Sequence, residues 1–334
     1  MSMAEFVGRE YRALQVSALS NDFSGTALVT QQIPAIADDA VLIRVKAASL
    51  NFPDVLMTQG KYQFKPELPF VPGLEASGEV VAVGQAVAHV RVGDAVIAMA
   101  RQGGLAEYLI AKPHEVRRMP ANLSWAQGAS YSVAGLTAYV ALVSRGHAGA
   151  KETLVVHGAT GGTGLAAVQL GKHLGMRVIA TGRSLAKLEI ARQMGADHLI
   201  EISTALRDDV LAATQGRGAD VVFDPIGGDV FDASVRALAW GGRLLVIGFV
   251  SGDAGQVRSN YALIKGISIV GVRAGEFVRR DPERGQAALA AIDGLAAQGV
   301  LLPPIGEQFA FADAKAALER LASGSIAGKL VVNM

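Results

Sequence analysis

A glycine-rich segment in the middle of the chain has residue types suited to phosphate binding. The hydrophobic run 153–157 leads into it, an amphipathic stretch follows, and the segment consists of Ala159, Thr160, Gly161, Gly162, Thr163 and Gly164. A glycine at 161 lets backbone approach a pyrophosphate, a glycine at 164 lets a helix pack close to the strand, and the helix N-terminus offers N–H groups. A tight strand-to-helix turn alone would also favour glycine. Because strand, helix and second strand follow in the expected lengths, the segment predicts a dinucleotide site.

The end of the second strand distinguishes between the two nicotinamide dinucleotides. The run 177–181 is followed by Gly182, Arg183 and Ser184, with Lys187 one turn further on. An NAD site places an acid here to bind the ribose 2′-hydroxyl, and an acid would repel a 2′-phosphate. Two cations and a hydroxyl would instead attract that phosphate, so the segment predicts NADPH as the cofactor. The alternative is that Ser184 is a helix N-cap and both cations are solvated.

The composition excludes several other kinds of chemistry. The chain has no cysteine, which removes disulfides, cysteine nucleophiles and thiolate metal sites. The six histidines show no ligand spacing, so we predict no metal site; they are His89, His114, His147, His157, His173 and His198. A net charge of +1 with scattered cations indicates neither a nucleic-acid nor a membrane partner, and leaves a small-molecule substrate.

The length and the hydrophobic pattern indicate two globular domains. With 334 residues, half of them hydrophobic and 18% charged, the chain is too long for one simple core. The first ten residues lack the apolar core of a signal peptide. The uncharged run 119–144 is interrupted by polar residues and indicates buried helices, so we predict a cytoplasmic protein.

The elements that must position these residues alternate in the second half of the chain. Residues 11–120 are β-rich, with strands expected at 41–50 and 77–84, and helical spacing covers 125–145. Strands are then expected at 153–157, 177–181, 198–202, 219–224, 242–249 and 267–272, and helices at 164–175 and 184–195. Two more helices, at 284–298 and 312–323, precede a last strand at 328–333. This pattern predicts an α/β protein with a doubly wound parallel sheet, apolar on both faces.

Seven segments carry a resemblance to a known family. They are NFPDVLMTQGKY (51–62), LPFVPGLEASGEVVAVG (68–84), VGDAVIA (92–98), GLAEYLI (104–110), GLTAYVAL (135–142), VVHGATGGTGLAAVQL (155–170) and DPIGGDVFD (224–232). In this order, over nearly the whole chain, they resemble the zinc-independent quinone oxidoreductases of the medium-chain dehydrogenase/reductase superfamily. The resemblance implies a barrel-like, GroES-like catalytic domain at 1–125 together with 266–334. It also implies a Rossmann-type NADPH-binding domain at 126–265, with the substrate in the cleft between the domains.

The resemblance also bears on metal and reaction. Zinc members of the superfamily carry Gly-His-Glu where this chain has Gly73, Leu74 and Glu75, and leucine cannot coordinate zinc. Glu75 is expected to persist as a structural ion-pair partner. A conjugated acceptor spreads incoming charge onto a remote oxygen and needs no Lewis acid. The implied activity is therefore hydride transfer from NADPH to a quinone or an α,β-unsaturated carbonyl.

Matching positions supply the remaining cofactor contacts. Asn51 is implied to orient the nicotinamide ribose, and Thr137 to contact the carboxamide end. Gly248 and Phe249 are implied to pass along the nicotinamide, and Lys329 to reach the cofactor. The alternative for Asn51 is a turn residue before Pro53. For Thr137 it is a helix-packing threonine, and for Lys329 a solvated lysine.

Three residues are assigned to the substrate side. Tyr62 matches the position where related enoyl reductases place a proton-donating tyrosine; the alternative is a cleft-lining aromatic, with water as the donor. Asp54 is expected to be a structural partner near the cleft and not an acid catalyst. Arg273 would suit an acidic or thioester acceptor if it faced the cleft, and otherwise pairs with Glu276 at the surface.

Two departures and two wider expectations complete the prediction. Ile202 and Ser325 stand where several family members carry Tyr and Arg, which leaves Arg183 and Lys187 as the main 2′-phosphate ligands.

The apolar strand 267–272 ends the sheet and would otherwise be an exposed edge, so a homodimer is expected. The alternative function is a redox-responsive or structural module that binds NADPH without turnover.

Overall fold

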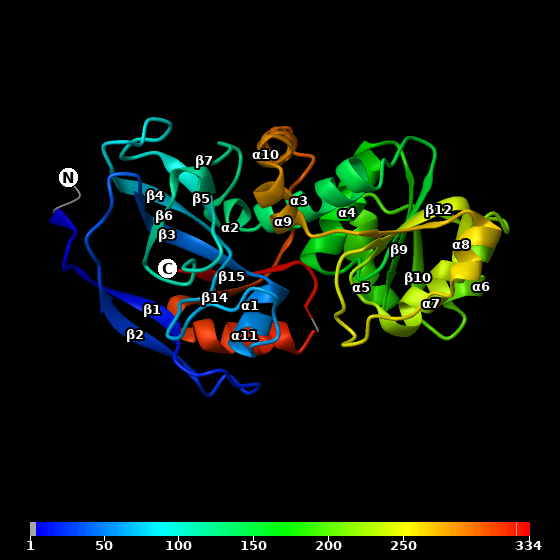
Figure 1. Cartoon of the computed structure of the whole chain (residues 1–334), viewed down its shortest axis with the longest axis horizontal. Helices are drawn as coiled ribbons and strands as arrows, with labels where there is room; N and C mark the ends of the chain where they lie inside the picture. The colour runs from blue at the N-terminus through cyan, green and yellow to red at the C-terminus, as the bar shows by residue number, and fades with distance from the viewer. Residues whose placement is uncertain (1–4, 325) are drawn as a thin grey trace. The chain divides into compact units, whose positions relative to one another are not determined.

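The computed structural model describes residues 5–324 and 326–334, which fold into two compact units. One unit comprises Met1–Val133 and Pro303–Met334, and the other comprises Ala134–Leu302. The first is β-rich and the second contains a parallel sheet flanked by helices, which confirms the predicted fold class (Figure 1).

The second unit ends at Leu302, and the chain returns to the first unit at Pro303. The predicted position of this return is between residues 265 and 266. The strand β13 (Ser268–Gly271) pairs in parallel with β12 (Leu238–Val246), so it belongs to the parallel sheet of the second unit. The helices α9 (Ala274–Arg280) and α10 (Pro282–Ala297) stay in the same unit. The chain therefore returns to the first unit only after α10.

The sheet of the second unit has the strand order β10-β9-β8-β11-β12-β13. The other strands are β8 (Thr153–Val156), β9 (Arg177–Gly182), β10 (His198–Glu201) and β11 (Ala219–Asp224). All neighbours are parallel, so the order reverses between β8 and β11, where sheets of this kind bind dinucleotides at the carboxyl ends of the strands. Every residue of β8 is buried, as expected for a strand covered on both faces.

Helices connect these strands and cover the sheet (Figure 1). They are α4 (Gly162–His173), α5 (Leu185–Gln193), α6 (Leu206–Ala213), α7 (Gly228–Ala237) and α8 (Ser259–Lys265). The unit begins within α3 (Ser132–Tyr139), which continues as a π-helical turn at Val140–Arg145.

The first unit is built around a seven-stranded sheet with the order β14-β15-β3-β4-β5-β7, and β6 pairs with β3. Its strands are β3 (Val41–Leu50), β4 (Glu75–Val83), β5 (Ala95–Met99), β6 (Tyr108–Ala111), β7 (Val116–Arg118), β14 (Ile305–Ala310) and β15 (Lys329–Asn333). A separate hairpin consists of β1 (Glu10–Val16) and β2 (Thr26–Gln32), and the helices are α1 (Phe52–Thr58), α2 (Trp125–Gly128) and α11 (Ala314–Ala322). Because the C-terminal β15 pairs with β3, residues from both ends of the chain share this core.

The register of the central strands brings distant residues to one end of the sheet. Leu330 of β15 pairs with Leu50 of β3, and Ser49 of β3 pairs with Glu75 of β4. Lys329, Asn51 and Glu75 are therefore neighbours in space. Within residues 5–324 and 326–334, no helix is long and apolar enough to cross a membrane.

Candidate functional site

The glycine turn lies at the carboxyl end of β8, as predicted. Gly158 has a φ of +60°, and Gly161 is the N-cap residue of α4, so Ala159 to Gly164 form the turn and the first helical residues. A side chain at Gly164 would overlap the carbonyl oxygen of Gly158, so only glycine lets α4 start this close to the strand. Among the described residues no side chain caps the start of α4. Backbone N–H groups in the first turn of a helix have no intrahelical partner, and this start therefore fits a phosphate.

A buried histidine fixes this turn to its neighbours, which the sequence did not indicate. His157 is fully buried; its Nδ1 lies 2.7 Å from Thr181 Oγ1 and its Nε2 lies 2.6 Å from Ser234 Oγ. Ser234 donates its hydroxyl proton to the Val230 carbonyl, so it accepts from Nε2–H, and Nδ1 accepts from Thr181. Burial lowers the pKa of His157, in keeping with this neutral ring. The histidine thereby joins the ends of β8 and β9 to α7.

The end of β9 presents the predicted 2′-phosphate ligands. Gly182 is buried at the end of the strand, while Arg183 and Lys187 are exposed. Ser184 occupies the N-cap position of α5, as its alternative interpretation states, but its side chain makes no capping hydrogen bond. Ile202 is half-buried just after β10, and Ser325 lies outside the described residues.

The predicted nicotinamide contacts of this unit lie on two other segments. Gly248 and Phe249 follow β12, and their loop is held against residues 225–226 by backbone hydrogen bonds from Val250 and Ser251. Thr137 is half-buried within α3. The nearby Asp224, at the end of β11, was missed from the sequence: its Oδ1 accepts the N–H groups of Ile226 and Gly227.

In the first unit, Asn51, Glu75 and Lys329 form a buried polar cluster. Lys329 Nζ donates to Asn51 Oδ1 at 2.7 Å and to Glu75 Oε1 at 2.8 Å, and Asn51 Nδ2 donates to Glu75 Oε1 at 3.0 Å. The lysine is 4% exposed, so its interpretation as a solvated side chain is wrong. The expected structural ion pair of Glu75 is present, with Lys329 as its partner. Asn51 is the N-cap residue of α1, with Pro53 in the first turn.

Asp54 is a structural partner of the backbone, as expected. It is fully buried, and its carboxylate accepts the N–H of Asn51 at 2.8 Å and the N–H of Gly73 at 2.9 Å. Burial raises the pKa of Asp54 to about 7, although these two hydrogen bonds and the charge of Lys329 lower it. The side chain fastens the start of α1 to the segment before Glu75.

Tyr62 is half-buried on an apolar cluster of the same unit. The buried members of this cluster are Val16, Met57 and Phe70, and Phe64 and Leu74 pack against it beside Tyr62. Leu74, at the position of a zinc ligand in other superfamily members, is thus a packing residue next to the tyrosine. The loop at Arg101 lies close by, with its guanidinium 4.8 Å from the centre of the Phe64 ring.

Arg273 is exposed at the N-cap position of α9. Its predicted pairing with Glu276 is wrong, because Glu276 binds Arg279 and Arg280, each at 2.7 Å. Arg279 and Arg280 follow Glu276 at i+3 and i+4 within the helix, whereas Arg273, also three residues from Glu276, has the non-helical backbone of an N-cap residue and so lies off that face.

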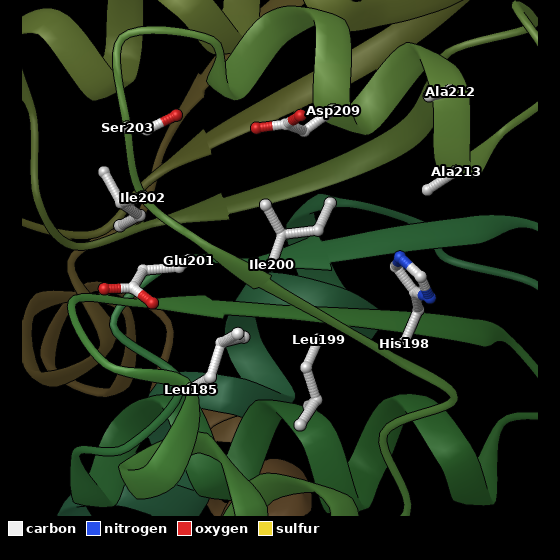
Figure 2. A pocket seen from close by; sticks show the side chains of 10 residues that line it. All are labelled: Leu185, His198, Leu199, Ile200, Glu201, Ile202, Ser203, Asp209, Ala212 and Ala213. Carbon is white, nitrogen blue, oxygen red and sulfur yellow. The ribbon is translucent and has the colours of Figure 1, made fainter.

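A separate open groove of about 680 Å³ lies along β10, the edge strand of the parallel sheet. Figure 2 shows Leu185 and Leu199 on one side of the strand, and Ile200 with Asp209 and Ala213 on the other. The glycine turn does not line this groove. The predicted dinucleotide site is therefore separate from this groove, because its residues lie at the start of α4 and at the ends of β8 and β9.

Comparisons with known proteins agree with this arrangement. The "Alcohol dehydrogenase GroES-like domain" family matches residues 37–122, and the "Zinc-binding dehydrogenase" family matches residues 162–293. A quinone oxidoreductase-like protein 2 homolog from Nematostella vectensis is 33% identical, over 97% of this chain and 89% of its own. A quinone oxidoreductase from Lama guanicoe is 32% identical, over 97% of this chain and 98% of its own.

Solved structures show the same fold. A probable oxidoreductase from Mycobacterium abscessus has a TM-score of 0.89 at 34% identity, covering 98% of this chain and 100% of its own. A mycobacterial protein solved in complex with NADPH has a TM-score of 0.88 at 27% identity, covering 97% of this chain and 100% of its own.

Proposed function

Because the chain belongs to the quinone oxidoreductase family of the medium-chain dehydrogenase/reductase superfamily, we propose that it transfers hydride from NADPH to a quinone or an α,β-unsaturated carbonyl, without zinc. The observation that carries the cofactor assignment is the pairing of an uncapped glycine-rich helix start with a basic strand end. Arg183 and Lys187 stand where a hydroxyl-binding acid would exclude a 2′-phosphate. The mycobacterial neighbour solved with NADPH supports the same assignment.

Each part of the cofactor has residues that would hold it. The first turn of α4 would bind the pyrophosphate through backbone N–H groups, and Arg183, Ser184 and Lys187 would bind the 2′-phosphate. Gly248, Phe249, Thr137 and Asn51 are the proposed contacts of the nicotinamide half, and Lys329 is proposed to act on it through Asn51. When bound, the reduced nicotinamide supplies the hydride, and the protein supplies orientation.

The first unit is proposed to complete the reaction with a proton. A conjugated carbonyl that has received hydride becomes an enolate, which needs a proton at carbon or oxygen. Tyr62 carries a phenolic hydroxyl, and tyrosine is one of the side chains that act as general acids. Leu74 and the absence of cysteine argue that this chain does not use zinc for that charge, because the ligand positions of the zinc members hold no coordinating group.

One experiment separates this proposal from the alternative of an NADPH-binding module without turnover. NADPH absorbance is followed with a panel of quinones, enones and enoyl thioesters. We expect oxidation with at least one acceptor class, and the pattern across the panel assigns the substrate class. Tight NADPH binding without oxidation of any acceptor would overturn the reductase and leave the module. Activity abolished by chelators and restored by zinc would contradict the metal-free mechanism.

A further inference from the structure

The buried cluster of Asn51, Glu75 and Lys329 is more than a hydrophobic core requires. The side chains of Lys329 and Glu75 are 5% and 1% exposed, respectively. Removing two charges from water is costly, and well-packed apolar residues often serve a core equally well. The two charges instead act on Asn51, the neutral member of the cluster.

The two charges determine which way the Asn51 amide points. Its oxygen receives a proton from Lys329 Nζ at 2.7 Å, and its nitrogen donates to Glu75 Oε1 at 3.0 Å. A flipped amide would set N–H against ammonium and oxygen against carboxylate. Both contacts would become repulsive in a site with little water, so only one orientation is stable.

The charged partners are themselves held in place. Glu75 Oε2 accepts the N–H of Val133 at 2.9 Å, so the carboxylate has one oxygen for this backbone and one for the cluster. Lys329 Nζ has a third acceptor in the Leu50 carbonyl at 3.4 Å. All three ammonium protons therefore have acceptors inside the protein.

The Asn51 side chain has one hydrogen-bonding position that the described part of the protein does not fill. The second proton of Nδ2 is directed to the Ser49 carbonyl at 3.4 Å, so both amide protons have acceptors within the protein. Oδ1 has two lone pairs, and Lys329 takes one. The remaining capacity of the amide is one acceptor position.

We propose that Glu75 and Lys329 are positioning residues that hold Asn51 as a hydrogen-bond acceptor for NADPH. The group it accepts from is a ribose hydroxyl or a carboxamide N–H of the nicotinamide half. This inference rests on the proposed function, in which Asn51 contacts the cofactor. Two residues without a metal-binding or acid–base role, Glu75 at the start of β4 and Lys329 at the start of β15, would thus fix the polarity of that contact.

The test exchanges the charge between two members of the cluster. Glu75→Gln removes the carboxylate and weakens the preference of the Asn51 amide for one orientation, because only Lys329 then opposes the flip. In the double variant Glu75→Gln/Asn51→Asp, the new amide at 75 can donate to the new carboxylate at 51, which also accepts from Lys329. The swap restores an acceptor at position 51 and keeps the net charge of the cluster. Glu79→Gln, the same change at a half-buried position on β4, is the matched control.

The readout is the dissociation constant for NADPH, measured by fluorescence without an acceptor substrate. We expect Glu75→Gln to weaken binding about tenfold, as for one lost hydrogen bond, and Glu79→Gln to leave it unchanged. The double variant should return to within about threefold of the wild type, whereas Asn51→Asp alone should not. Circular dichroism and thermal melting establish that each variant is folded.

Two results would overturn the inference. One is a Glu75→Gln variant that binds NADPH as tightly as the control. The other is a folded double variant that binds as weakly as Glu75→Gln, and this arm decides the question even if the single variant fails to fold. A wild type that binds NADPH but reduces no acceptor would refute the reductase alone, since the binding readout is independent of turnover.

Discussion

At the scale of single residues, we expect the choice of cofactor to depend on the cations after β9. Arg183→Ala should weaken NADPH binding by about 1.5–3 kcal/mol, the usual value for a hydrogen bond to a charged group, and should leave NADH binding nearly unchanged. Arg192→Ala, an exposed arginine on α5 paired with Glu189, is the control. Isothermal titration with both cofactors measures the effect. Equal wild-type affinities for NADPH and NADH, with no change in Arg183→Ala, would contradict the 2′-phosphate assignment.

We propose that the hydroxyl of Tyr62 supplies the proton that completes the reaction. If it donates the proton, Tyr62→Phe should lower turnover of an enone by roughly 10²–10⁴-fold, as for loss of a general acid, with little change in NADPH affinity. A quinone should be less sensitive, because its reduced product takes protons readily from water. Tyr108→Phe, on another face of the same unit, controls for loss of a hydroxyl. Full activity of Tyr62→Phe on both acceptors would leave water as the donor.

At the scale of elements, the hydrophobic pattern located most strands and many helices. The predicted strands 41–50 and 219–224 coincide with β3 and β11, and the predicted dinucleotide turn lies where α4 begins. From the sequence, Glu75 could be predicted to form an ion pair, but the residue that pairs with it could not be named. Asn51 and Lys329 are 278 residues apart, and only the antiparallel pairing of β15 with β3 makes them neighbours. Sequence spacing carries no information about such a pairing.

The start of α1 contains a group that makes stability depend on pH. Burial raises the pKa of Asp54 to about 7, well above its ordinary value of 3.8, so the folded chain keeps a proton that the unfolded chain loses. The free energy of unfolding should therefore fall by about 1.4 kcal/mol per pH unit between these two values and level off above pH 7. Asp54→Asn lacks this titration.

Urea unfolding at pH 5, 6, 7 and 8 measures this dependence. The stability of the wild type relative to Asp54→Asn should decrease from pH 5 to 7 and then stay constant. Asp39→Asn is the control, since Lys112 lowers the pKa of that exposed carboxyl and leaves it ionised over the whole range. A difference between wild type and Asp54→Asn that is the same at all four pH values would refute the titration of Asp54.

At the scale of the whole molecule, the division into units could be predicted only in part. The resemblance implies a return to the β-rich unit after 265, although the strand expected at 267–272 was itself predicted to end the parallel sheet. That strand, β13, is short and mostly exposed, and its pairing with β12 keeps it and the two helices after it in the second unit. The edge position that makes β13 hard to assign from sequence also makes it a candidate for contact with another chain.

We expect that contact to be a second copy of the same chain, giving a homodimer. The strand β13 has β12 on one side only, and Ile269 on it is 38% exposed. Other large apolar side chains of this unit are also exposed, with Trp240 at 78% and Leu263 at 83%. An unpaired edge strand and exposed apolar side chains are covered in most proteins, and pairing two β13 strands about a two-fold axis would extend both sheets at once.

Light scattering at micromolar concentration tests this expectation. The wild type should have twice the mass of one chain, and the double variant Ile269→Lys/Leu263→Lys should shift toward the monomer, because two like charges would face each other across the axis. Val92→Lys, which adds a lysine at an exposed apolar position of the β-rich unit, should remain a dimer. Loss of the dimer should leave the affinity for NADPH within a few-fold of the wild type, since all the proposed phosphate ligands belong to one chain. A monomeric wild type would show that β13 is a solvent-exposed edge, and its short length would then be what prevents association.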